Sequence, residues 1–237
     1  MRPAMLNNQD HFSLNLNVRG LEESATLAIN DQSKNLIYQG KSVYRLGLGQ
    51  SPFPVPASVQ EALRQNAHQK DYLPVQGLRA LREAVSRHHA KYDGIHFNPD
   101  SVLIGPGSKE LMFLLQLSYY GDLVIPTPCW VSYSPQAQIV GRPVVTIATT
   151  FENRWRLQPD SLHQLCKQDP GRPRIVILNY PGNPEGGTYN KETLKEIAEI
   201  ARKYDLILLS DEIYGKLTYN GEHVSIARYY PEGTIVS

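Results

Sequence analysis

Short apolar runs alternate with longer amphipathic segments from residue 101 to the end of the chain. The runs are too short for helices and are typical of buried strands, whereas the segments between them place apolar residues at helical spacing. Strands separated by helices predict a three-layer α/β fold, in which a mostly parallel sheet is covered by helices on both faces. We expect strands at 101–104, 122–126, 143–148, 174–179 and 206–210, and helices at 109–119, 131–140, 160–167 and 191–204.

The pattern ahead of residue 100 is less regular. Two helices are expected at 57–67 and 77–92, where apolar positions recur with the spacing of one helix face. The segment Ser51-Pro-Phe-Pro-Val-Pro56 is excluded from a helix or a central strand, because its alternate prolines remove amide donors and fix φ. Residues 1–45 are polar and mixed, with one short helix expected at 22–29, and we expect them to form an arm that packs on something else.

Composition and charge argue against a nucleic-acid-binding, membrane or secreted protein. Of the 237 residues, 41% are hydrophobic and 20% charged, which is ordinary for a soluble globular protein. The net charge of +1 gives no attraction to nucleic acid or to a membrane surface, and no apolar run is long enough to span a bilayer. Residues 1–10 lack the apolar core of a secretory signal, and Cys129 and Cys166 lack metal-ligand spacing. We therefore expect a cytoplasmic protein without a metal site.

Residues that can carry chemistry gather where strands are expected to end, the edge at which parallel sheets bind ligands. Gly105-Pro-Gly-Ser108-Lys109 joins a strand to a helix, and its free amides with the Ser108 hydroxyl can hold a phosphate. A plain turn capped by Ser108 is the alternative. Trp130 follows the strand at 122–126 and can stack on a flat heterocycle, with Tyr133 one turn further along the same wall. A tryptophan packed in the core is the alternative there.

Two further motifs follow the strands at 174–179 and 206–210. Asn183 lies in the loop Asn179-Tyr-Pro-Gly-Asn-Pro-Glu-Gly-Gly-Thr188, whose prolines and glycines control the backbone more closely than most turns require. An ordinary turn, in which asparagine is also favoured, is the alternative. Asp211 places a carboxylate at the mouth of a buried strand, where a cation such as a protonated pyridine nitrogen would stabilise it. An aspartate that caps the following turn is the alternative.

In order and spacing these motifs resemble the aspartate aminotransferase family, the class I/II pyridoxal 5′-phosphate enzymes of fold type I. The resemblance runs from about residue 43 to the end of the chain. It implies a set of contacts to the cofactor: to the phosphate from Ser108 and Lys109, to the ring face from Trp130, to the phenolic oxygen from Asn183 and Tyr214, to the pyridine nitrogen from Asp211, and to the phosphate of the neighbouring subunit from Tyr72.

The resemblance also implies domains and a reaction. Residues 1–45 would form an N-terminal arm with part of a small domain, and residues 46–237 a cofactor-binding large domain that is incomplete at its C-terminal end. Gly47 or Gly49 is similar to the glycine whose backbone meets the substrate α-carboxylate. The implied homodimeric enzyme moves an amino group between an amino acid and a 2-oxo acid, and Lys109 favours aspartate or another dicarboxylic donor. A solvent-exposed lysine on the first helical turn is the alternative for Lys109. A lyase or decarboxylase of the same fold and a non-catalytic fragment are the alternatives.

The chain departs from the family pattern in its reactive groups. The Schiff-base lysine of the family would lie beyond Ser237, and the arginine that binds the substrate carboxylate is absent as well. Lys216 follows Tyr214 by two residues, where the family has no catalytic lysine, and we expect it at the surface. We therefore expect a fragment of a longer enzyme that contains no catalytic residue and is inactive alone.

Overall fold

A five-stranded sheet forms the centre of the computed structural model, which describes residues 13–47, 49, 51–219 and 221–237. The strand order is β2-β1-β3-β4-β5, and every neighbouring pair is parallel. This arrangement confirms the predicted parallel α/β fold. The strands are β1 (Asp122–Thr127), β2 (Val144–Ala148), β3 (Arg174–Asn179), β4 (Ile207–Asp211) and β5 (Thr234–Val236).

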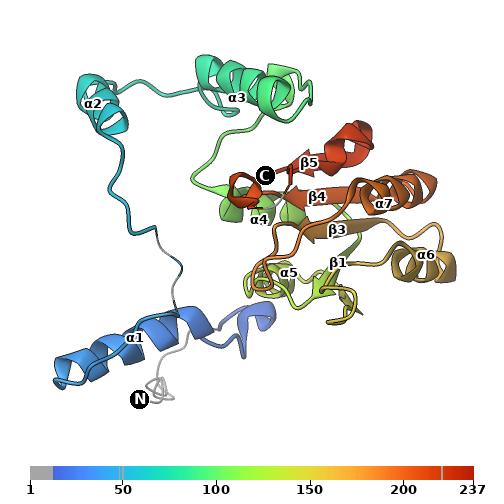
Figure 1. Cartoon of the computed structure of the whole chain (residues 1–237), viewed down its shortest axis with the longest axis horizontal. Coiled ribbons are helices and arrows are strands. Elements are labelled where there is room, and N and C mark those ends of the chain that lie inside the picture. The colour runs from blue at the N-terminus through green and yellow to red at the C-terminus, as the bar shows by residue number, and fades with distance from the viewer. Residues whose placement is uncertain (1–12, 48, 50, 220) are drawn as a thin grey trace.

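Helices cover both faces of this sheet, as Figure 1 shows. The helices α4 (Ser108–Ser118) and α5 (Tyr133–Ile139) lie on one face, and α6 (Pro159–Gln168) and α7 (Lys191–Lys203) lie on the other. Successive strand residues point to opposite faces, so Leu123 and Ile125 pack against α4 and α5 while Val124 packs against α6 and α7. A buried parallel strand is therefore apolar at consecutive positions, which is the pattern of the sequence.

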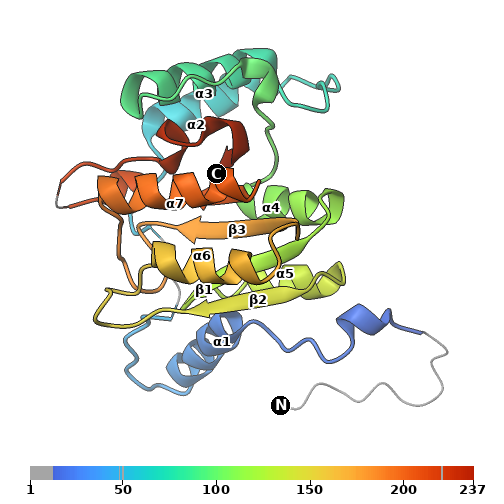
Figure 2. The same cartoon turned by 90° about the vertical axis from the view of Figure 1, so that its right-hand side faces the viewer.

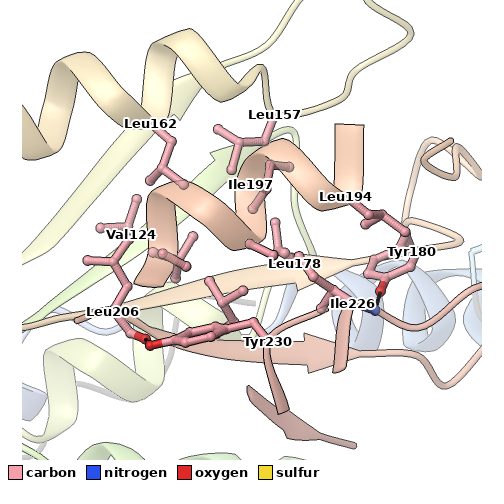
Figure 3. Packing of buried hydrophobic residues seen from close by; sticks show 14 of the residues in the cluster. Val124, Leu157, Leu162, Leu178, Tyr180, Leu194, Ile197, Leu206, Ile226 and Tyr230 are labelled. Carbon is pink, nitrogen blue, oxygen red and sulfur yellow. Dashed lines mark hydrogen bonds between the residues drawn. The ribbon is translucent and has the colours of Figure 1, made fainter. Parts of the chain in front are cut away.

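Two buried tyrosines pack in the core beneath α6 and α7 (Figure 3). The Tyr180 hydroxyl accepts a 2.7 Å hydrogen bond from the Ile226 amide, and the Tyr230 hydroxyl donates to the Leu206 carbonyl at 3.0 Å. These bonds satisfy polar groups that would otherwise be buried without a partner. They also fasten the segment after β4 at Ile226 and Tyr230; this segment contains the short helices η3 (Gly215–Leu217), η4 (Ile226–Arg228) and η5 (Pro231–Gly233).

The N-terminal elements stand apart from the sheet (Figures 1 and 2). After η1 (Leu16–Val18) come α1 (Ala25–Tyr38), α2 (Ala57–Asn66) and α3 (Arg79–Tyr92). Neither α1 nor α2 contains a buried residue. The helix predicted at 22–29 corresponds to α1, which begins later and is longer than predicted. The polar residues of α1 face solvent and do not end the helix.

One predicted strand is absent from the sheet. Ser101 ends the short helix η2 (Pro99–Ser101), and residues 102–104 follow it without pairing to a strand. The Ile104 amide donates at 3.0 Å to the carbonyl of Gln76, ahead of α3, and the Val102 amide donates to Pro99. These backbone amides are thus paired within loops, and the prediction of a strand at 101–104 was wrong. Across the described ranges, no helix combines the length and the apolar character needed to cross a bilayer.

Candidate functional site

The carboxyl ends of β3 and β4 lie next to each other at one edge of the sheet. Asn179 ends β3, Asp211 ends β4, and the two residues are register partners. The side-chain nitrogen Nδ2 of Asn179 donates a 3.0 Å hydrogen bond to the backbone carbonyl of Asp211. Two polar residues are therefore fixed together at the edge where parallel sheets bind ligands.

Asp211 is a buried carboxylate with few partners. The residue is 5% exposed, and its Oδ2 accepts a 2.6 Å hydrogen bond from the Tyr133 hydroxyl. Within the described ranges, its Oδ1 receives only a 3.4 Å contact from the Ile213 amide. Burial raises the pKa of Asp211, and the Tyr133 bond opposes that shift. No ion pair among the described residues includes Asp211, so a cation beside Oδ1 would supply the missing interaction.

An aromatic wall flanks this carboxylate. Tyr133 opens α5 and is 1% exposed, and burial followed by the nearby charge of Asp211 raises the pKa of its phenol. The phenol therefore stays protonated and donates. The ring of Trp130, just ahead of α5, meets Tyr133 edge to face at a centroid distance of 5.4 Å. The Lys109 ammonium lies 5.5 Å from the centre of the Trp130 ring, which brings the start of α4 to the same wall.

The loop after β3 is held by its own polar groups. The Asn183 amide donates to Oδ1 of Asn179 at 2.7 Å, and the Gly182 amide donates to the Gly187 carbonyl at 2.9 Å. A Cβ on Gly182 would lie 1.6 Å from Oε1 of Glu185, so any larger residue there would require the Glu185 side chain to move. The bond to Asn179 uses the backbone N–H of Asn183. The side-chain carboxamide of Asn183 forms no hydrogen bond within the described part of the chain and is free for a ligand.

A small pocket opens between this loop and the end of β1. Burial raises the pKa of Glu185, whose Oε2 is inaccessible to solvent and has no hydrogen-bond partner among the described residues. Burial also raises the pKa of the Cys129 thiol, and the Glu185 charge adds to that shift. The pocket includes Asn183 from the predicted site and Tyr133 from the predicted aromatic wall, but not Asp211. The residues that line it are Ile125, Pro126, Pro128, Cys129, Tyr133, Trp155, Ile177, Asn179, Asn183, Glu185 and Tyr189.

The start of α4 presents unpaired backbone amides. Gly107 is the N-cap and has a φ of 102°, a value that favours glycine. The amides of Ser108 and Lys109 donate to no described residue, whereas the Glu110 amide donates to the Gly107 carbonyl at 3.2 Å. Free amides at the positive end of a helix can hold a phosphate dianion. Ser108 is the first helical residue and makes no capping bond, so the alternative of a turn capped by Ser108 is wrong.

Comparison with known proteins agrees with this geometry. Residues 41–236 match the family Aminotransferase class I and II. The chain belongs to that family. It is 36% identical over 221 residues to an aspartate aminotransferase of Geobacillus stearothermophilus, a match that covers 91% of this chain and 56% of that protein. It is 34% identical over 228 residues to an asparagine–oxo-acid transaminase of Streptococcus mutans, with coverage of 94% and 56%.

The solved structures extend the likeness to three dimensions. The aspartate aminotransferase of Thermus thermophilus with maleate superposes with a TM-score of 0.88 at 33% identity, covering 95% of this chain and 59% of that one. An aspartate aminotransferase from Rhizobium meliloti gives a TM-score of 0.85 at 27% identity. The predicted fold class is thereby confirmed. The chain spans 56% of the length of the curated relatives described above.

The class I and II aminotransferases use pyridoxal phosphate, and the chemistry of this edge fits that group. The buried Asp211 carboxylate lacks a cation among the described residues, which suits a protonated ring nitrogen. The unpaired amides of Ser108 and Lys109 suit a phosphate, and the Trp130 ring suits a flat heterocycle.

The other residues that the sequence singled out differ in their placement. Tyr214 lies three residues beyond Asp211, half-buried and near enough to Tyr133 to contribute to the raised pKa of that phenol, and its hydroxyl makes no hydrogen bond with a described residue. Tyr72 is fully exposed on the link between α2 and α3, and Gly47 and Gly49 lie on the segment between α1 and α2 (Figure 1). The roles predicted for these residues stay predictions. Lys216 is exposed, as expected, with its ammonium 3.1 Å from Asp93.

Sequence reasoning missed several residues at this edge. Asn179 ends an apolar run as Asp211 does, so its position carried a usable signal. Trp155 reaches the pocket from a turn with a φ of 56°, which no local pattern indicates for a tryptophan. Glu185 lies in the loop that was singled out for Asn183, but its burial depends on how that loop closes.

Proposed function

We propose that this chain is the cofactor-binding part of a pyridoxal-phosphate-dependent aminotransferase, and that the whole protein moves an amino group between an amino acid and a 2-oxo acid. The observation that carries the proposal is the buried Asp211 carboxylate at the edge of the parallel sheet, with no cationic partner among the described residues. When bound, pyridoxal phosphate supplies an electron-withdrawing ring that stabilises negative charge on the substrate carbon.

In this proposal Asp211 keeps a proton on the ring nitrogen through its charge, and Tyr133 holds the carboxylate in place at 2.6 Å. Trp130 covers one face of the ring. The Asn183 amide and the Tyr214 phenol donate to the phenolic oxygen of the ring. The support for these two assignments is that neither side chain is engaged in a hydrogen bond with the rest of the described chain.

The phosphate is assigned to Ser108 and Lys109, because their amides are unpaired at the start of α4. Tyr72 is assigned to the phosphate of a neighbouring subunit in a homodimer, in keeping with its full exposure on its own chain. The backbone of Gly47 or Gly49 would meet the substrate α-carboxylate. In this scheme residues 1–45 are an arm with part of a small domain, and residues 46–237 belong to the large domain.

Aspartate is the amino donor that we favour. The relatives described above are named for aspartate and for asparagine, and the Lys109 ammonium lies against Trp130, where it can meet a distal carboxylate. We further propose a cytoplasmic location, because the cysteines Cys129 and Cys166 are both free thiols, which fits a reducing compartment.

Two measurements test this function. The whole protein, given pyridoxal phosphate, aspartate and 2-oxoglutarate, should form glutamate. Release of ammonia or carbon dioxide without glutamate would instead support the lyase or decarboxylase alternative. On the present chain, Asp211→Ala should weaken binding of pyridoxamine 5′-phosphate at least about tenfold in calorimetry, because a charge-assisted bond is lost. Asp160→Ala, on the exposed side of α6, is the matched control. Equal affinity of both variants would refute the role of Asp211.

A further inference from the structure

Helix α5 contacts both ends of the site described above. Tyr133, its first residue, donates to Asp211, and Gln136, one turn later, donates from Nε2 to the backbone carbonyl of Lys109 at 2.7 Å. We propose that Gln136 is a positioning residue that holds the phosphate-binding turn of α4 at a fixed separation from Asp211. This inference rests on the proposed function, since it assigns Gln136 to one half of the proposed cofactor site.

The contact of Gln136 is part of a buried polar chain. Its Oε1 accepts a 3.0 Å hydrogen bond from Nε2 of Gln116, which lies two turns further along α4 than Lys109. Gln116 is 2% exposed and Gln136 is 7% exposed. The side-chain carboxamide of Gln136 therefore bonds to α4 at two points on the same face. Both helices lie on the same side of the sheet (Figure 1). Oε1 of Gln116 is buried without a partner among the described residues, so the two bonds that Gln136 makes are the directional contacts that fix one packing arrangement among those that apolar contacts alone would allow.

The Lys109 carbonyl, to which Gln136 donates, lies where it can orient the unpaired amides of Ser108 and Lys109. Lys109 is the second residue of α4, and its own amide is one of the two that have no acceptor among the described residues. Holding its carbonyl restricts rotation of the first turn, and so the direction in which the amides of Ser108 and Lys109 point. The carbonyls at the other end of α4, of Gln116 and Tyr119, are bound by Arg142.

An apolar packing role would predict something different from a positioning role. If Gln136 only filled space, methionine would replace it with little effect, because the two side chains have similar length and flexibility. If Gln136 orients the phosphate turn, methionine should weaken binding only of ligands that carry a phosphate. The consequence to measure is the preference for a phosphorylated ligand over its unphosphorylated analogue.

The test compares the dissociation constants of pyridoxamine 5′-phosphate and pyridoxamine by calorimetry. Gln136→Met should reduce the preference for the phosphorylated ligand by about fivefold or more, because a buried bond of the turn is lost. Gln138→Met is the matched control, since Gln138 is exposed on the same helix and its side chain bonds to no described residue. Tyr133→Phe should weaken both ligands by the same factor, because Tyr133 contacts the ring end of the site.

A second variant covers the case in which Gln136→Met does not fold. Gln116→Met keeps the bond from Gln136 to Lys109 but removes its anchor, and should lower the same preference by a smaller factor. If the unmodified chain shows no preference for the phosphorylated ligand, the proposed function fails and the inference fails with it. If the chain shows the preference and both glutamine variants keep it, the inference alone is overturned.

Discussion

The Tyr133 hydroxyl donates a 2.6 Å hydrogen bond to Asp211, although the two residues are 78 positions apart in the sequence. The bond joins the first turn of α5 to the last residue of β4, so it crosses from the helix layer to the sheet. Both residues are almost fully buried. This bond is therefore the main interaction that keeps the Asp211 carboxylate in one orientation.

Replacing Tyr133 with phenylalanine should lower the free energy of unfolding by about 1–3 kcal/mol, because a buried carboxylate loses its donor. Among the described residues the Asp211 carboxylate would then keep only the 3.4 Å contact of its Oδ1 with the Ile213 amide, so the pKa of Asp211 should rise further. Urea denaturation at neutral pH measures the loss of stability. Tyr120→Phe, which changes a 76% exposed tyrosine, should leave stability unchanged. An equal effect of the two substitutions would contradict the prediction.

Replacing Asp211 with asparagine should make the ligand-free chain more stable at neutral pH. Burial raises the folded-state pKa of Asp211 above its ordinary value of 3.8. The stabilising contribution of the protonated carboxyl is therefore complete below pH 3.8 and is lost as the pH rises through the higher folded-state pKa. Asparagine keeps an acceptor for Tyr133 but carries no charge.

The measurement for Asp211→Asn is the melting temperature by circular dichroism over a series of pH values. The variant should melt above the unmodified chain at neutral pH, and the difference should shrink as the pH approaches 3.8. Asp160→Asn, at an exposed position of α6, should show no such trend. A variant that melts lower than the unmodified chain at neutral pH would show that the charge of Asp211 is compensated.

Local patterns predicted those parts of the fold that depend on neighbours in sequence. The run at 174–179 coincides with β3, because a strand that is buried on both faces is apolar at consecutive positions. The segment at 191–204 differs from α7 by one residue, because a helix that is buried on one face repeats its apolar residues at helical spacing. The run at 101–104 was misjudged because its amide partner, Gln76, lies far away in the sequence. The Tyr133–Asp211 bond escaped prediction for the same reason, although Asp211 had been assigned to the site and Tyr133 to the wall formed by Trp130.

Gly121 should not tolerate alanine. It precedes β1 with a φ of 125°, and a Cβ there would lie 2.3 Å from the backbone carbonyl oxygen of Pro173. Because that neighbour is backbone and because the φ is unfavourable for any side chain, Gly121→Ala should cost at least about 2 kcal/mol in urea denaturation. Gly171→Ala is the control, since its Cβ would meet nothing within 4 Å, and it should be neutral or slightly stabilising. Similar losses from both would show that the chain relaxes around Gly121.

Arg142 should be required for the end of α4. Its guanidinium donates to the carbonyls of Gln116 in the last turn of α4, of Tyr119 at the C-cap, and of Gly121 in the link to β1. Burial lowers the pKa of Arg142, but the group remains charged at neutral pH. Arg142→Met keeps the apolar stem and removes every donor, so it should cost about 3 kcal/mol and should speed hydrogen exchange of the last amides of α4. Arg87→Met, at an exposed position of α3, should change neither quantity. Unchanged exchange in α4 after Arg142→Met would mean that the helix end is held by its apolar packing alone.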